Sequence, residues 1–210
     1  MRFHRSISHI AGVLLLLSPA TWSLARGSTA AAASDKGKIP ITTNSEEAKK
    51  EFLLGRDVFE KLQAQESIKH FDKAIALDSN FASAELARAN SAPTAKDFFD
   101  HLKKAVSLSD KASEGERLLI LANQAGANGR PAEQKQYLDK LAASYPEDER
   151  VQFNLGGYYF GQQDYDQAVA HYKKATDISP DYSPAYNLLG YAYRQQGNYS
   201  SAEDAFKKYV

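Results

Sequence analysis

From Asn44 onward, apolar residues recur every three to four positions, the spacing of amphipathic helices. The first such helix carries Phe52 and Phe59 on one face, and Ser45 followed by acidic residues predicts its start. Further helices are expected over Gln65–Leu77, Phe81–Asn90, Ala95–Leu108, from Ser113 to about Gly126 and from Pro131 to before Pro146. Two more helix pairs are expected after them, the first ending before Pro180 and the second ending with a helix over Ser200–Val210. The pattern predicts an all-α chain.

The C-terminal part of the chain contains an internal repeat of 34 residues. The stretch LGGYYFGQQDYDQAVAHYKKATDISP has a near copy downstream, in which Gly156 corresponds to Gly190 and Ala168 to Ala202. A period of this length is typical of stacked helix–turn–helix units. Small residues at these positions let two helix backbones cross closely, and the aromatic residues between them fill the gaps.

These residues resemble the tetratricopeptide repeat (TPR) family. The resemblance implies a TPR-type α-α superhelix, a solenoid of antiparallel helix pairs, because each pair alone would leave an apolar face in water. We expect about five units, over residues 45–79, 80–112, 113–146, 149–180 and, incomplete, 183–210.

Two departures from the repeat pattern stand in the first half of the chain. Ser67 occupies a position at which the family usually has alanine, and Pro93 cuts the second unit after a short first helix. Thr94 is a plausible N-cap for the helix that follows. We therefore expect a distorted second unit.

The N-terminus has the three zones of a secretory signal peptide. Basic Arg2 and Arg5 precede an apolar run, and Ser23-Leu24-Ala25 offers small residues for cleavage after Ala25. An uncleaved membrane anchor is the alternative, but the apolar run is about 11 residues, short of the roughly 20 that span a bilayer. Residues 26–43 are rich in small and polar residues and are predicted to be a flexible linker.

Composition narrows the partner classes. The net charge is zero, with 26 basic and 26 acidic residues, which gives no general attraction to nucleic acid. The chain has no cysteine, so it has no disulfide framework and no thiolate metal site. No stable membrane insertion is expected after signal cleavage.

The sequence carries no motif for catalysis or cofactor binding. His70, His101 and His171 fall on predicted second helices and form no H-E-x-x-H pair, so we expect packed or solvated histidines. There is no nucleophile elbow and no glycine-rich phosphate loop. We predict no catalytic residue, no metal site, no cofactor and no enzymatic activity.

The TPR resemblance implies that the first helices line a groove for an extended peptide or a partner helix. The positions that face it are, in the fourth and fifth units, Phe153, Phe160, Asn187, Tyr191 and Arg194. The Lys-Asn-Arg clamp that one TPR subset uses for a terminal carboxylate is not assembled. The groove is instead expected to be aromatic. Alternatively, Phe153 and Phe160 simply pack between units.

The leading hypothesis is an exported, periplasmic or extracellular scaffold that binds protein or peptide partners. The alternative is the regulatory solenoid of a longer enzyme or transport component, with its effector region beyond Val210. Apolar residues persist to Val210 in a predicted helix without a stop signal, which favours a truncated chain over an end completed by another molecule.

Overall fold

The computed structural model describes residues 37–209, and all of their regular structure is helical. The all-α prediction is confirmed for this part of the chain. One short 3-10 helix, η1, covers Ser109–Lys111. The α-helices are α2 (Glu46–Glu60), α3 (Ala64–Leu77), α4 (Ala82–Asn90), α5 (Ala95–Leu108), α6 (Glu114–Ala127), α7 (Pro131–Ser144), α8 (Glu149–Gly161), α9 (Tyr165–Ile178), α10 (Ser183–Gln195) and α11 (Tyr199–Tyr209).

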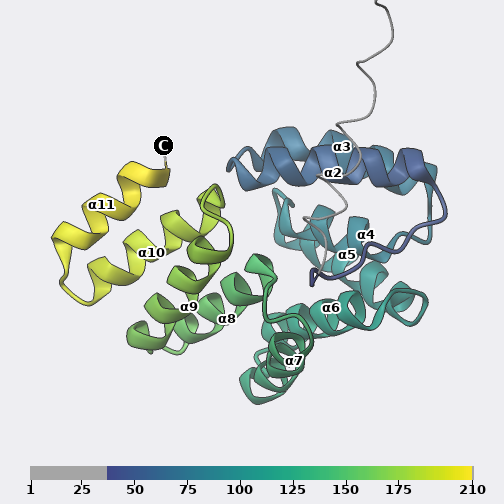
Figure 1. Ribbon diagram of the computed structural model, residues 1–210. Coiled ribbons are helices and arrows are strands. Elements are labelled where there is room, and N and C mark those ends of the chain that lie inside the picture. The colour runs from purple at the N-terminus through teal and green to yellow at the C-terminus, as the bar shows by residue number, and fades with distance from the viewer. Residues whose placement is uncertain (1–36, 210) are drawn as a thin grey trace, which may run out of the picture. The chain divides into compact units, whose positions relative to one another are not determined.

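Consecutive helices form antiparallel pairs, α2 with α3 through α10 with α11, and each pair packs on the next (Figure 1). Within three of the pairs a glycine of the first helix lies directly beneath an aromatic ring of the second. Gly55 lies under Phe71, and Gly190 lies under Phe206. A Cβ at Gly156 would stand 2.5 Å from the Tyr172 ring. The absence of a side chain therefore sets the distance between the two helices of a pair.

Side chains between successive pairs bury the apolar faces. One cluster joins Leu118 and Leu138 of the third pair to Val151 and Leu155 of α8. Another joins Tyr172 of α9 to Leu189 and Ala192 of α10. The aliphatic and aromatic residues that recur with helical spacing thus form the contacts that hold the stack together.

Helix starts follow the predicted capping chemistry. The Ser45 side chain accepts from the Ala48 N–H, and Thr94 accepts from Asp97. Ser113, at the predicted start of α6, forms a capping box with Glu116. The helix predicted over Ala95–Leu108 is observed with these bounds.

The irregular second pair is tied to the first by buried polar groups. Ser67 and Ser91 share a hydrogen bond of 3.0 Å, so the serine at an alanine position has a partner. Arg88, which is 9 % exposed, donates to Asp72 of α3 and Asp97 of α5 at 2.7 Å each. These bonds give the short helix α4 fixed partners on both sides.

The predicted flexible linker, residues 26–43, is wrong at its C-terminal end. Residues up to 36, and with them the predicted signal peptide, lie outside the described part of the chain. Residues 37–43, which we call the N-terminal strap, are docked on the helices through hydrogen bonds to Glu116 and Asp148. Ile39 and Ile41 each pack against a core cluster. The small and polar composition of this segment favoured disorder. Its two isoleucines and the hydrogen-bond acceptors on the helices nevertheless hold it in place.

Among residues 37–209, no helix has both the length and the apolar character needed to cross a bilayer.

The glycine–aromatic crossing can be tested at adjacent glycines. Gly156→Ala should lower the free energy of unfolding by about 1–3 kcal/mol, because the new methyl group meets the fully buried Tyr172 ring. Chemical denaturation followed by circular dichroism measures the change.

Gly157→Ala is the matched control. Its Cβ would meet nothing nearer than the Tyr172 hydroxyl at 3.9 Å, so the helix gains about 0.5–1 kcal/mol from the better helix former. Equal effects of the two substitutions would contradict the proposed crossing.

Candidate peptide-binding surface

The two predicted groove residues on α8 are half-buried rather than free. The ring of Phe153 lies 5.8 Å from Tyr172 and 5.6 Å, edge-on, from Tyr182. Phe160 meets Tyr165 edge-on at 5.5 Å. Both phenylalanines also border the cluster between α9 and α10. The alternative of packing between units therefore accounts for most of their contacts, while each retains part of its surface.

The predicted residues on α10 are more open. Tyr191 is 37 % exposed, its ring stands edge-on to Phe206, and the Arg194 guanidinium lies 4.9 Å from its centroid. Arg194 is exposed, and Asn187 is half-buried one turn before Tyr191. The structure thus brings Tyr191 and Arg194 together as a cation–π pair on the surface.

The cluster that Phe153 and Phe160 border contains an unusual polar group. Tyr172 is fully buried, and its hydroxyl has no hydrogen-bond partner within residues 37–209. Burial raises the pKa of this phenol, which keeps it neutral. The hydroxyl lies beside Gly157, an exposed position without a side chain. A ligand that approached the backbone at Gly157 would come close to this unpaired group.

An ion-pair network joins α2 to α8, and periodicity gave no sign of it. Arg150 lies one turn before Phe153 on the same helix face. Its guanidinium contacts Glu60 of α2 at 2.8 Å and also pairs with Glu149. Arg56 contacts the same Glu60 at 3.9 Å. The charges come from residues about 90 positions apart, so no local pattern could reveal them.

The network sets the charge state of Arg150. Burial opposes its charged form, but Glu60 and Glu149 outweigh burial and raise the pKa of Arg150. Burial, with the nearby Arg150 charge, lowers the pKa of Arg56. The guanidinium of Arg150 also lies 5.8 Å from the centroid of the buried Tyr182 ring. The surface next to Phe153 is therefore polar, and ion pairs fix the position of its Arg150 side chain.

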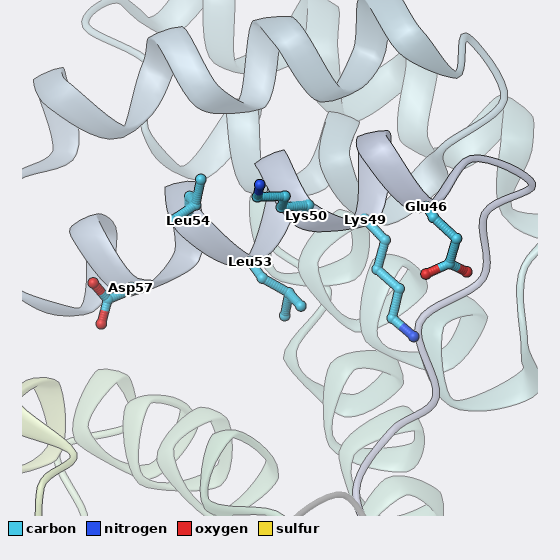
Figure 2. Close-up of a pocket in the computed structure, with 6 residues that line it drawn as sticks. All are labelled: Glu46, Lys49, Lys50, Leu53, Leu54 and Asp57. Carbon is cyan, nitrogen blue, oxygen red and sulfur yellow. The ribbon is translucent and has the colours of Figure 1, made fainter. Parts of the chain in front are cut away.

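A hollow lies on an exposed face of α2 (Figure 2). Leu53 and Leu54 lie between charged residues along this face. Leu54 precedes Gly55 as Leu155 precedes Gly156, yet Leu54 is 42 % exposed and Leu155 only 2 %. Six residues line the hollow: Glu46, Lys49, Lys50, Leu53, Leu54 and Asp57.

Charged residues on this face of α2 replace apolar ones that stack elsewhere. Counting from the glycine, Lys50 corresponds to the buried Val151, and Asp57 to Tyr158. A polar outer face is typical of a terminal repeat. The hollow is therefore better explained as the polar end of the stack than as a binding site.

Each histidine of the described region has a side-chain neighbour. His70 bonds Glu51 at 2.9 Å and His101 bonds Glu85 at 2.6 Å. His171 bonds Gln152 and stacks on Tyr159. Burial, followed by Lys174, lowers the pKa of His171. Within residues 37–209, no three histidine or acidic side chains gather as a metal site would require.

The unpaired Tyr172 hydroxyl is expected to lower the stability of the fold. Tyr172→Phe should raise the free energy of unfolding by about 1 kcal/mol, because it removes a buried polar atom without a partner and keeps the ring over Gly156. Thermal and denaturant unfolding measure the difference.

Tyr137→Phe serves as the control, since the Tyr137 hydroxyl donates to Glu133 at 3.2 Å. That substitution should leave stability unchanged or lower it slightly. A loss of stability in Tyr172→Phe would mean that its hydroxyl is bonded in solution.

Comparisons with known proteins agree with the helix-pair architecture. Residues 147–210 match the family model described as tetratricopeptide repeat. The solved structure of PilW, a widely conserved type IV pilus biogenesis factor, is 22% identical over 79% of this chain and 77% of that chain, with a TM-score of 0.50.

A chain of the APC/C hetero-tetramer Cut9–Hcn1 is 19% identical over 85% of this chain and 38% of that chain, with a TM-score of 0.52. No curated protein sequence matched. At these identities the structural similarities establish the fold alone. The predicted resemblance is confirmed over residues 147–210, which match the tetratricopeptide repeat model, and the solved structures share the fold of stacked helix pairs.

Proposed function

We propose that this chain is an exported, non-catalytic scaffold that binds a protein or peptide partner along α8 and α10. The binding surface comprises Phe153, Phe160, Asn187, Tyr191 and Arg194. Tetratricopeptide repeats are typically interaction modules without catalytic groups, and PilW, which has this fold, is a pilus biogenesis factor. The proposal rests chiefly on the surface chemistry of this chain.

The observation that carries the proposal is the exposed pair of Tyr191 and Arg194. Tyrosine and arginine are enriched among the residues that dominate binding energy at interfaces. Phe206 and Arg194 hold the Tyr191 ring in place from two sides, so little side-chain entropy remains to be lost on binding. The half-buried Phe153 and Phe160 border the apolar cluster between α9 and α10 and add apolar surface.

The polar groups near Phe153 suit an extended main chain. Gly157 leaves the helix backbone open, and the unpaired Tyr172 hydroxyl lies beside it. Arg150, one turn before Phe153 on α8, adds a guanidinium that is paired with the Glu60 carboxylate of α2. A partner with an aromatic or aliphatic anchor and a nearby acidic side chain fits this combination, because Arg194 is exposed and positively charged.

Export follows from the N-terminal pattern of the sequence. A basic start, an apolar run of about 11 residues and the small residues Ser23 and Ala25 favour a cleaved signal peptide. The partner is then a periplasmic or extracellular protein.

The binding surface is tested by substitution in the full chain. Tyr191→Ala should weaken partner capture from the exported fraction about 30-fold, which corresponds to the loss of roughly 2 kcal/mol at an interface anchor. Quantitative mass spectrometry of proteins captured by tagged wild type and variant measures the loss.

Phe99→Ala is the matched control, because Phe99 is also an exposed aromatic residue, 49 % against 37 % for Tyr191, and lies on α5 outside the proposed surface. Partners should be retained by Phe99→Ala and lost by Tyr191→Ala while both variants melt like the wild type. Retention of every partner by Tyr191→Ala would refute the surface.

Export is tested by the N-terminus of the mature chain. After expression in a secretion-competent host, the exported protein should begin at Arg26, as read by mass spectrometry of its N-terminal peptide. A chain that keeps Met1 and stays with the cells would contradict the signal peptide.

A further inference from the structure

The N-terminal strap is bound as an extended peptide along one edge of the helix stack. Ile39, Ile41 and Thr43 are half-buried, whereas the residues between them, Pro40 and Thr42, are exposed. This alternation is that of a β-like strand with one side on a surface. Pro40 restricts Ile39 to extended conformations, and the β-branched residues favour the same region.

Carboxylates along this edge accept the main-chain N–H groups of the strap and the residue after it. Ile39 N–H donates to Asp148 at 2.9 Å, and Thr42 N–H donates to Glu116 at 3.0 Å. Asn44 N–H donates to Asp78 at 3.2 Å. Hydrogen bonds from a main-chain N–H to an ionised acceptor are stronger than neutral ones. These carboxylates thus bind an extended main chain whatever side chains it carries.

Side-chain contacts add specificity at each step. Lys38 pairs with Glu149 and donates to the Glu147 carbonyl at 2.7 Å. Ile39 lies against Gly115, where a Cβ would come within 3.0 Å of its methyl group. Ile41 packs on the cluster around Phe52 and Phe81. Thr43 donates to Asp78 at 2.6 Å.

The acceptors come from separate helix pairs. Asp78 ends α3, Glu116 lies in the first turn of α6, and Asp148 and Glu149 begin α8. We call these four residues the acidic edge. Burial favours the neutral form of Glu149, but Arg150 and then Lys38 outweigh it and hold the pKa of Glu149 below its usual range. Thr43 lowers the pKa of Asp78.

We propose that the acidic edge is a recognition site for extended peptides, separate from the surface on α8 and α10, and that residues 38–43 occupy it as an internal ligand. The peptide it selects has a basic residue, then two aliphatic residues flanking a proline, then hydroxyl residues. A partner segment of this chemistry binds by displacing the strap. Because the strap is covalently attached, it competes at an effective concentration of ~1 mM.

The test uses the full chain with its strap displaced. Ile39→Asp with Ile41→Asp places two charges against apolar clusters, which should release the strap. The probe is a fluorescent synthetic peptide with the sequence of residues 37–44, followed by fluorescence polarisation. It should bind the displaced variant saturably and at least tenfold more tightly than the wild type. A peptide with Glu in place of Lys38 and Asp in place of Ile39 should not bind.

A second variant keeps the proposal testable if the double substitution does not fold. Asp148→Asn retains a good N-cap for α8 but presents an amide, in place of a carboxylate oxygen, to the Ile39 N–H. Hydrogen exchange at residues 39–43 should accelerate at least tenfold. Asp164→Asn is its control, since Asp164 caps α9 in the same way and has no strap contact among its hydrogen bonds.

Two outcomes would overturn the proposal. One is a folded, displaced variant whose strap exchanges freely but which does not bind the probe peptide. The other is unchanged protection of the strap in Asp148→Asn, which would show that the edge does not hold it. Either result leaves the surface on α8 and α10 unaffected.

Discussion

The close crossing of two helices at a glycine is the contact on which the rest of this structure depends. Gly55, Gly156 and Gly190 each accept an aromatic ring where any other residue would place a Cβ less than 3.0 Å away. The rings of Phe71 and Tyr172 then reach onward to the next pair, as Tyr172 does in the cluster with Leu189. One small residue therefore fixes both the geometry of a pair and the orientation of the side chain that joins it to its neighbour. The acidic edge and the surface on α8 and α10 both lie on this stack of helix pairs.

The two proposed recognition sites differ in their physical basis. The surface on α8 and α10 presents an aromatic anchor and a cation, with affinity drawn from buried apolar area. The acidic edge presents carboxylates to main-chain N–H groups, so its strength comes from charge-assisted hydrogen bonds. The Arg150 network lies near both, since Glu149 pairs with Lys38 of the strap as well as with Arg150. A substitution of Glu149 would therefore disturb both the strap and the Arg150 ion-pair network.

Local patterns predicted the helices well because helix formation is decided by spacing, caps and breakers within a few residues. The helix at Ala95–Leu108 and the capping box at Ser113 follow from such signals. Exposure of the groove residues was less predictable: Phe153 is half-buried because Tyr182 of the next unit covers it, and that contact depends on tertiary packing. The Arg150–Glu60 pair and the strap were missed because their partners are distant in sequence. Lys38 and Thr42 are typical linker residues by local sequence, and only the assembled edge supplies acceptors for the Lys38 ammonium and the Thr42 N–H.

The strap also has a consequence for the order in which the molecule forms. Most contacts in a helix-pair stack are between neighbours, so such chains can fold progressively. The strap is an exception, because Lys38 and Ile39 reach partners 111 and 109 residues further along the chain. During synthesis or export from the N-terminus, this segment emerges before its binding site and must wait for α8. This early segment is thus among the last of the described residues to become ordered, and until then it is an unbound peptide that other proteins can engage.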